Sequence, residues 1–332
     1  MKTFCDAQYR DKSVLITGGL GFIGSNLAHR LVECGSRITL VDSLIPEYGG
    51  NLFNIKDIED KVTLNVADVR DHNAIEYLVQ DKDFIFNLAG QVSHSDSMSD
   101  PMTDLEINCK SQLSILEACR HKNPGVSIVF AGTRQQYGRP EYPPVDEAHL
   151  QRPVDVNGIN KVSGGSYHLL YNHVYGIKTV SLRLTNTYGP RQLMKHNRQG
   201  FVYWFIRQAI EGKELQIFGD GKQLRDFTYV DDAVDALLLA GGSKEACGKV
   251  FNLGGERPYS LLEFTEALLK ECDQASYKIV PFPEDKKIID IGDFYADFTL
   301  IKDTLGWSPT VELASGLKKT VDYYKENLAH YI

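Results

Sequence analysis

The chain has 332 residues, of which 42% are hydrophobic and 24% are charged, and its formal net charge is −8. This length suffices for one large α/β domain and a smaller one, and the composition is that of a globular protein with a substantial core. A net negative charge disfavours nucleic-acid binding, because contacts with a phosphate backbone depend on clustered lysine and arginine. An anionic ligand would have to be bound by local groups of positive charge.

Six cysteines are scattered along the chain, and no two of them form a CxxC pair. No apolar run precedes the first predicted strand, and no segment is apolar over the thickness of a bilayer. We therefore expect a cytoplasmic protein with reduced cysteines, without a membrane contact and without a metal site. The cysteines are Cys5, Cys34, Cys109, Cys119, Cys247 and Cys272.

Seven short apolar runs rich in β-branched residues are separated by segments that are mostly long enough for helices. Runs of this kind, without polar alternation, are typical of parallel strands that are buried on both faces. The predicted fold class is therefore α/β, with a doubly wound parallel sheet of the Rossmann type. The predicted strands are residues 13–19, 37–43, 62–69, 83–90, 126–133, 179–184 and 249–253.

From Thr185 the regular alternation ends, and the following segments indicate loops, short strands and helices of a second lobe. The run at 249–253 is expected to return to the sheet, so that the two parts of the chain interleave. We assign residues 1–184 and about 226–253 to the sheet domain, and about 185–225 and 254–332 to a smaller C-terminal substrate lobe.

A glycine pattern follows the first predicted strand, with Gly18, Gly21 and Gly24 spaced three apart at a strand-to-helix turn. Such glycines let the backbone approach a pyrophosphate, which the helix N-terminus then faces. The second strand ends at Asp42, where a carboxylate accepts hydrogen bonds from both adenosine ribose hydroxyls and repels a 2′-phosphate. We predict NAD rather than NADP as the cofactor, with a mere strand-end cap as the alternative role of Asp42. Further predicted cofactor contacts are Phe22, Ile23, Asp68, Val69, Leu88 and Ala89.

Motifs outside the glycine turn extend over nearly the whole chain: "NLAGQ" after the fourth strand, "EIN" at Asn108, and "NTYGPRQ", "FGDGKQLRDFTYVDDAVDA" and "LGWSP" beyond it. Together with "TGGLGFIGS" they resemble the extended short-chain dehydrogenases/reductases, the superfamily of nucleotide-sugar epimerases, dehydratases and decarboxylases. A narrower likeness is to CDP-tyvelose 2-epimerases and UDP-glucose 4-epimerases.

The resemblance implies catalytic roles for single positions. In these enzymes a threonine four residues before a Tyr-Gly pair holds the sugar oxygen that is oxidised, and Thr133 before Tyr137 matches it. A lysine on the next helix binds the nicotinamide ribose and lowers the pKa of a tyrosine one turn earlier, which is the general base. Lys161 matches the lysine, but the tyrosine position is Asn157. Residues four apart share a helix face, so Asn157 points to the same site.

Asn157 can orient a hydroxyl, but an amide has no proton that titrates near neutrality, so it cannot be the base. Three other groups can accept the proton instead, namely His94 on the loop after the fourth strand, Lys161 and Tyr137. Histidine is the side chain best matched to proton transfer at about pH 7, although a lone loop histidine can also be solvated or structural. Tyr137 can instead be an aromatic residue packed under the site.

Two positions after Thr133 exclude close relatives. Where similar 4,6-dehydratases have Asp and Glu, this chain has Arg134 and Gln135. The glutamate used by glucuronate decarboxylases is likewise replaced by the glutamine. Epimerisation is compatible with the residues that remain, because it needs only a hydride path and one proton acceptor.

The resemblance also indicates residues for a nucleotide-diphosphate sugar. Arg225 matches an arginine that holds the substrate pyrophosphate, with a surface salt bridge to Asp226 or Asp231 as the alternative. Arg191 belongs to a basic loop that either closes on the diphosphate or is simply solvated. Asn186 resembles an asparagine that touches the substrate, and Phe201, Val202 and Gln216 either surround the base or pack in the core.

We predict an NAD-dependent epimerase that oxidises one carbon of a nucleotide-diphosphate sugar and reduces it again from the other face. The alternatives are a related sugar-nucleotide oxidoreductase or dehydratase with rearranged acid/base groups, and a non-catalytic NAD-binding protein. The resemblance implies a homodimer that pairs through the helices after the fourth and fifth strands. The apolar positions expected at this contact are Leu113, Ile115, Leu116, Tyr167, Leu170 and Val174.

Overall fold

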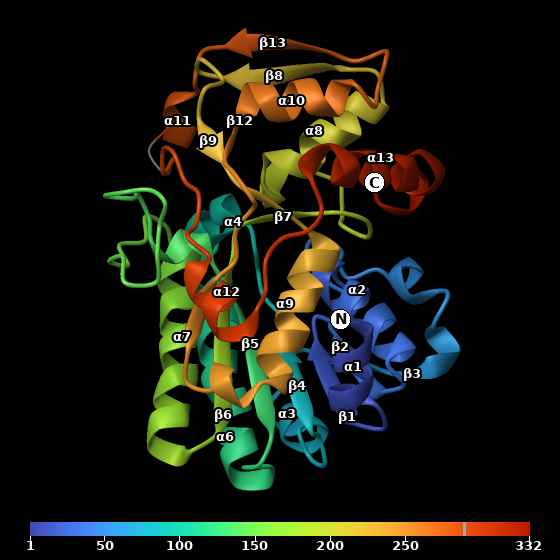
Figure 1. Cartoon of the computed structure of the whole chain (residues 1–332), viewed down its shortest axis with the longest axis vertical. Coiled ribbons are helices and arrows are strands. Elements are labelled where there is room, and N and C mark those ends of the chain that lie inside the picture. The colour runs from blue at the N-terminus through green and yellow to red at the C-terminus, as the bar shows by residue number, and fades with distance from the viewer. Residues whose placement is uncertain (288–289) are drawn as a thin grey trace.

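Seven parallel strands form one sheet at the centre of the larger part of the protein (Figure 1). The computed structural model describes residues 1–287 and 290–332. The strand order β11–β6–β5–β4–β1–β2–β3 confirms the predicted doubly wound sheet, and each predicted strand is present. The strands are β1 (Ser13–Thr17), β2 (Arg37–Asp42), β3 (Val62–Val66), β4 (Phe84–Asn87), β5 (Ser127–Thr133), β6 (Lys178–Leu184) and β11 (Val250–Asn252).

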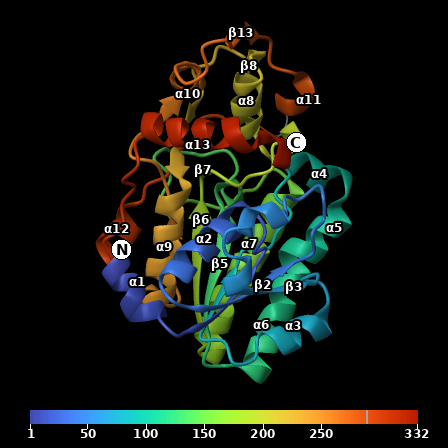
Figure 2. The same cartoon turned by 90° about the vertical axis from the view of Figure 1, so that its right-hand side faces the viewer.

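Helices cover both faces of this sheet (Figure 2). Successive side chains of β1 point to opposite faces, so Val14 and Ile16 join one hydrophobic core while Leu15 joins the other. A strand buried in this way shows the continuous apolar run from which it was predicted. One face carries α2 (Phe22–Glu33) and α9 (Val230–Gly242), and the other carries α3 (His72–Leu78), α6 (Ser111–Lys122) and α7 (Val156–Tyr175).

A smaller lobe lies beyond the carboxyl ends of the strands (Figure 1). Its helices are α8 (Phe201–Ile210), α10 (Leu261–Leu269), α11 (Glu284–Lys287) and α13 (Leu313–Asn327). Three strand pairs accompany them: β7 (Asn186–Tyr188) with β10 (Phe227–Tyr229), β8 (Glu214–Phe218) with β13 (Ser276–Val280), and β9 (Leu224–Arg225) with β12 (Tyr259–Ser260).

The chain returns from this lobe to the sheet. β11 pairs with β6 although the residues of β7 to β10 lie between them in the sequence, and α12 (Thr299–Leu305) packs beside β11. We therefore propose the interleaved division into a sheet domain and a substrate lobe at the boundaries predicted from the sequence.

The first helix, α1 (Lys2–Tyr9), is fastened to the sheet domain at two points. The Tyr9 hydroxyl donates a hydrogen bond to the carbonyl of Leu238 at 2.6 Å. Cys5 and Cys34, at the end of α2, form a disulfide with their Cα atoms 5.7 Å apart. The prediction that all cysteines are reduced is therefore wrong for this pair, because the contact arises from the packing of α1, which the spacing of the cysteines does not indicate.

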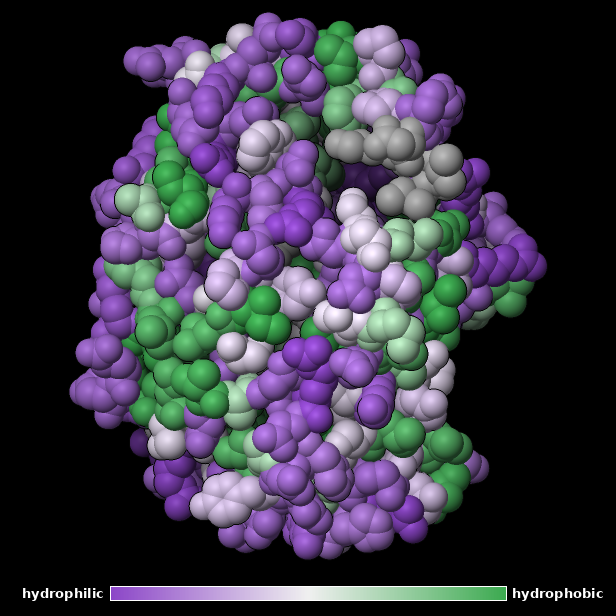
Figure 3. All heavy atoms as spheres, turned by 180° about the vertical axis from the view of Figure 1, so that it is seen from behind, coloured by the Kyte–Doolittle hydropathy of each residue, from purple (hydrophilic) through white to green (hydrophobic). Residues whose placement is uncertain are grey.

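The predicted dimer contact needs one correction. Ile115 and Leu116 on α6 are 1% and 0% exposed, because they fill the core of their own subunit, so the prediction that they form a subunit contact is wrong. Leu170 and Val174 on α7 are 49% and 54% exposed. Seen from behind, the surface is mostly hydrophilic and carries separate groups of hydrophobic residues (Figure 3). Within the described ranges, no helix has the combined length and apolar character needed to cross a bilayer.

Candidate functional site

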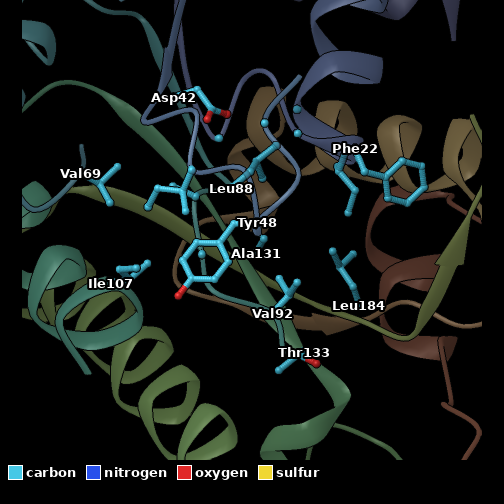
Figure 4. Close-up of a pocket in the computed structure, with 18 of the residues that line it drawn as sticks. Phe22, Asp42, Tyr48, Val69, Leu88, Val92, Ile107, Ala131, Thr133 and Leu184 are labelled. Atoms are coloured by element: carbon cyan, nitrogen blue, oxygen red, sulfur yellow. The ribbon is translucent and has the colours of Figure 1, made fainter. Parts of the chain in front are cut away.

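One cavity of about 310 Å³ lies at the carboxyl ends of the central strands. The glycine turn before α2, the ends of β4 and β5, and the start of α7 line it. Figure 4 shows Asp42 and Thr133 toward opposite ends of this cavity, with Tyr48 between them. All the residues predicted to contact the cofactor line the cavity, together with the catalytic candidates Thr133, Asn157, Lys161 and His94.

The turn between β1 and α2 depends on its glycines. Gly18 has a φ of +67°, and a Cβ at this position would come within 3.0 Å of the Ala89 backbone. Gly21 is the N-cap of α2, and no side chain caps the first N–H groups of the helix. Uncapped N–H groups at a helix start are a binding site for phosphate oxygens, so the turn fits the pyrophosphate of a dinucleotide.

Asp42 ends β2 beside this turn, and its carboxylate is already oriented. Oδ2 accepts a hydrogen bond from the backbone N–H of Leu20 at 3.1 Å, and Oδ1 accepts one from Leu44 at 3.0 Å. Burial raises the pKa of Asp42, while these two hydrogen bonds act in the opposite direction. Each oxygen has a further lone pair, so the carboxylate fits the two ribose hydroxyls of NAD.

The walls between these groups come from the ends of β3 and β4. The Thr17 hydroxyl accepts hydrogen bonds from the backbone N–H groups of Leu88 and Ala89, both at 3.1 Å, and so fixes the end of β4. Asp68 is turned toward Arg70, whose Nη2 donates to Oδ2 at 2.7 Å. This hydrogen bond lowers the pKa of Asp68. The carboxylate of Asp68 is therefore already paired within the protein.

Lys161 reaches the middle of the cavity from α7. Its Nζ donates to the carbonyl of Ala131 on β5 at 3.2 Å. Burial lowers the pKa of Lys161 to about 8, and the nearby Asp104 carboxylate acts to raise it. A Cβ at Gly90 would lie 2.9 Å from Nζ, so the missing side chain there leaves room for the ammonium group. Lys161 can therefore hold a positive charge in the site near neutral pH.

Both protons of the Asn157 amide are engaged. Nδ2 donates to the carbonyl of Gln91 at 2.8 Å and to Oδ2 of Asp104 at 3.1 Å. Oδ1 remains, and an amide oxygen only accepts. The residue at the tyrosine position of similar enzymes is thus able to orient a hydroxyl but not to exchange a proton with it.

Asp104, in α5 (Pro101–Leu105), is the centre of a buried network that the sequence did not reveal. Its carboxylate is 0% exposed and accepts hydrogen bonds from the amides of Asn108 at 3.0 Å, Asn157 at 3.1 Å and Asn160 at 2.7 Å. Because these amides come from two helical segments, the network fixes the start of α7 against α5.

His94, the first residue of α4 (His94–Ser99), is held in one orientation. Its Nδ1 lies 2.8 Å from Oδ2 of Asp155, and its Nε2 lies 2.9 Å from Nε2 of Gln135. A carboxylate only accepts, so Nδ1 carries the proton and Nε2 presents its lone pair to the Gln135 amide. Burial acts to raise the pKa of Asp155, but the hydrogen bond and charge of His94, the backbone N–H of Gly158 and the charge of Arg134 together lower it. Nε2 of His94 is therefore the possible acceptor, and a carboxylate holds the ring at Nδ1.

Asp155 also starts the helix that carries the other catalytic candidates. Its Oδ1 accepts a hydrogen bond from the backbone N–H of Gly158 at 2.6 Å, which makes it the N-cap of α7. An aspartate before a helical segment is a readable start signal. Its second contact, with a histidine 61 residues earlier, depends on the fold.

The two other candidates near β5 differ in access. Thr133 lines the cavity, and its Oγ1 accepts from the backbone N–H of Gln135 at 3.4 Å, so its own proton is free for a ligand. Tyr137 is 0% exposed, donates to Oδ1 of Asn252 at 2.6 Å and accepts from Arg183 at 2.5 Å. Burial raises the pKa of Tyr137. Tyr137 is therefore a packed aromatic residue and not a base for this cavity.

The predicted pyrophosphate arginine is buried at the edge of the lobe. Arg225 donates to the carbonyl of Gly292 at 2.5 Å, and its Nη2 lies 3.7 Å from Oδ1 of Asp290. Burial lowers the pKa of Arg225. In the described part of the chain it forms neither of the alternative salt bridges, to Asp226 or to Asp231.

The remaining predicted substrate residues make contacts within the protein. Arg191 donates to Oδ1 of Asn26 at 2.7 Å. Phe201 and Val202 pack in the hydrophobic core at the start of α8, and Gln216 is exposed on β8. These four side chains and Arg225 do not line the cavity, and Asn186 lies beside it on β7.

The basic loop after β7 is tied to the loop after β2. Nζ of Lys195 lies 3.0 Å from Oε1 of Glu47, and Arg198 pairs with Glu47 and, at 3.2 Å, with Asp96. Tyr48, next to Glu47, lines the cavity. These ion pairs connect the two loops at its border.

The chain is similar to known proteins over most of its length. A family model described as "NAD dependent epimerase/dehydratase family" matches residues 14–254. The chain is 31% identical over 317 residues to the UDP-glucose 4-epimerase of Mycolicibacterium smegmatis, covering 94% of this chain and 98% of that protein.

Two solved structures are similar over most of both chains. The UDP-glucose 4-epimerase of Thermotoga maritima with UDP-glucose has a TM-score of 0.86 and 32% identity, covering 95% of this chain and 99% of that chain. The UDP-glucuronic acid 4-epimerase of Bacillus cereus, in complex with UDP-glucuronic acid and NAD, has a TM-score of 0.83 and 29% identity, with coverage of 95% and 99%.

Proposed function

Because the chain belongs to the NAD dependent epimerase/dehydratase family, we propose that it is an NAD-dependent epimerase of a nucleotide-diphosphate sugar. The proposal is carried by one observation, the cavity in which the glycine turn and Asp42 meet Thr133, Lys161 and His94. A dinucleotide site that continues into groups able to move a proton suits the oxidation of a bound carbinol and its reduction. NAD is the cofactor of this family, and UDP-sugars occupy two solved relatives.

Three residues position the sugar oxygen. Bound NAD supplies reversible hydride transfer at the carbinol carbon. Thr133 donates a hydrogen bond to the oxygen of that carbon, and Oδ1 of Asn157 accepts one from a neighbouring hydroxyl of the sugar, which leaves the reacting proton for the base. Lys161 binds the nicotinamide ribose and places its positive charge beside the oxygen as negative charge develops there.

His94 is the proposed base. Its Nε2 takes the hydroxyl proton as the carbon loses hydride, and returns the proton when the keto sugar is reduced from its other face. Asp155 stabilises the charged ring, because the hydrogen bond at Nδ1 becomes an ion pair. The Gln135 amide must then turn, and its Oε1, which has no partner among the described residues, is an acceptor for the protonated Nε2.

The two alternative functions explain less of this geometry. A dehydratase requires an acid and a base to remove water, and the positions next to Thr133 hold an arginine and a glutamine. A protein that only binds NAD has no need of a histidine held by a carboxylate beside Thr133 and Lys161.

Sugar nucleotides offered in D₂O test the proposal. An epimerase that returns the same hydride gives an epimer without carbon-bound deuterium, detected by NMR. Deuterium at a neighbouring carbon together with loss of water would favour the dehydratase alternative. If no sugar nucleotide is converted and none raises the melting temperature, the protein is not an epimerase of this class.

We also propose a homodimer that pairs through α7, since Leu170 and Val174 are exposed on it. Light scattering at micromolar concentration measures the mass directly. A monomer there would contradict the proposal.

A further inference from the structure

Arg134 is a partly buried cation beside the proposed reaction centre. It follows Thr133 directly and begins a short 3-10 helix, η4 (Arg134–Gln136). Its Nη2 donates to Oδ1 of Asn186 at 3.3 Å, and its guanidinium carbon lies 5.5 Å from the centre of the Phe294 ring. Its Nη1 is buried and has no hydrogen-bond partner in the part of the chain that the structure describes.

A guanidinium in this state is unusual. Buried polar groups are nearly always hydrogen-bonded, and a buried charge without an ionic partner destabilises the fold. Among the side chains that the structure describes, no carboxylate lies within ion-pair distance of Arg134. Burial and, to a smaller extent, the charge of Arg225 lower the pKa of Arg134 to about 9. One nitrogen of this cation, Nη1, therefore stays without a partner among the described residues.

The surrounding groups indicate a polar ligand with its own negative charge. Arg225 repels Arg134, while Asp226, Asp290 and Asp155 attract it from a distance. Burial raises the pKa of Asp226 to about 6, so this acid is only weakly held in its charged form. Oδ1 of Asp226 and Oε1 of Gln135 also lack partners among the described residues, which suits the hydroxyl groups of a sugar.

We propose that Arg134 binds a carboxylate on the sugar ring, so that the preferred substrate is a nucleotide-diphosphate sugar acid. This inference rests on the proposed function. Thr133 holds the reacting sugar oxygen in that proposal and lines the cavity, and adjacent Cα atoms are about 3.8 Å apart, so the Arg134 backbone lies beside the sugar and not at the distant end of the nucleotide. A carboxylate matches the guanidinium fork with two hydrogen bonds and neutralises its charge, whereas a sugar hydroxyl leaves the charge unmatched.

Binding of matched pairs of ligands tests the inference. Dissociation constants are measured by calorimetry with NAD present for UDP-glucose against UDP-glucuronate, GDP-mannose against GDP-mannuronate, and UDP and GDP alone. We expect the acid of at least one pair to bind about 10- to 100-fold more tightly than its neutral partner, as a charge-assisted hydrogen bond provides. Arg134→Gln should remove this preference and Arg134→Lys should keep part of it. Arg152→Gln, at an exposed arginine paired with Glu141, is the matched control and should change nothing.

Each other outcome has a definite meaning. Equal binding of acids and neutral sugars by the unmodified protein overturns the inference and leaves the proposed function standing. An equal loss of affinity for UDP or GDP in Arg134→Gln assigns the arginine to the diphosphate and also overturns it. If no nucleotide ligand binds, the proposed function fails as well. Without ligand, Arg134→Gln should melt no lower than the unmodified protein, because it removes a charged group whose buried Nη1 has no partner among the described residues. A lower melting temperature would indicate a structural role and contradict the inference.

Discussion

The two ends of the cavity differ in how far the protein satisfies its own polar groups. At the cofactor end, both oxygens of Asp42 accept backbone hydrogen bonds, and Thr17 fixes the end of β4. Next to the end with Thr133, where the sugar is proposed to bind, Arg134, Gln135 and Asp226 each keep a buried polar atom without a partner in the described ranges.

This difference in hydrogen bonding suits a cofactor that stays bound at one end and a substrate that is exchanged at the other. Groups already held by the backbone are preorganised and keep their geometry whether or not the ligand is present. Unsatisfied buried groups raise the free energy of the free protein, and a ligand that pairs with them lowers it again. The cofactor end is therefore suited to retention, and the sugar end to selection among substrates.

The largest expected effect is at His94, which tests whether the sugar end holds the base. His94→Asn should lower kcat by about 10²- to 10⁴-fold, the usual contribution of positioned acid/base catalysis, and flatten the acidic limb of the pH–rate profile. His173→Asn, at an exposed position of α7, is the control. An unchanged rate and pH profile in His94→Asn would remove histidine from the mechanism and leave Lys161 as the candidate.

The next effect tests the preorganised end. Asp42→Ala removes the acceptor for two ribose hydroxyls, so the dissociation constant of NAD should rise by about 10- to 100-fold while that of NADP changes less. Fluorescence titration of both cofactors measures this, with the exposed Asp303→Ala as control. Equal affinity of the unmodified protein for NAD and NADP would contradict the ribose argument.

A change at Asp104 should sharpen the comparison, because this carboxylate acts on both Lys161 and Asn157, which lie between the two ends. Asp104→Asn removes the charge that raises the pKa of Lys161, so Lys161 should lose its proton below pH 8 and the alkaline limb of the rate profile should move to lower pH. One of the two accepting oxygens becomes an amide donor, so the hydrogen bonds on that side are lost and the free energy of unfolding should fall by about 1–3 kcal/mol. The control is Asp322→Asn, in an exposed ion pair with Lys318. An alkaline limb that does not move would separate Lys161 from the pH dependence.

The smallest effect is expected at Asn157. If its Oδ1 only orients a hydroxyl, Asn157→Ala should reduce kcat by about 3- to 10-fold, as the loss of one neutral hydrogen bond does. Steady-state kinetics on a converted sugar nucleotide provides the measurement. A loss as large as that of His94→Asn would show that the amide does more than orient.

The parts that the sequence predicts well are those encoded within one segment. The apolar run of β1 and the glycines after it form a local pattern, and Asp42 stands at the end of a single strand. The pairs His94–Asp155 and His94–Gln135 join residues that meet only when α4, α7 and η4 have packed, so no local pattern indicates them. The wrong prediction for α6 has a similar cause. An apolar helix face does not show whether its own subunit or a second subunit covers it.

β11 comes late in the sequence although it pairs with β6, and this has a consequence during protein synthesis. β6 (Lys178–Leu184) is complete long before Val250–Asn252, its neighbour on one side, leaves the ribosome. At about 5–20 residues per second, the nascent chain exposes one apolar strand edge for several seconds. An exposed edge of this kind can pair with another chain. Because the chain interleaves, the edge of β6 stays open until the C-terminal half of the nascent chain has been made. Until then, a chaperone would have to protect that edge.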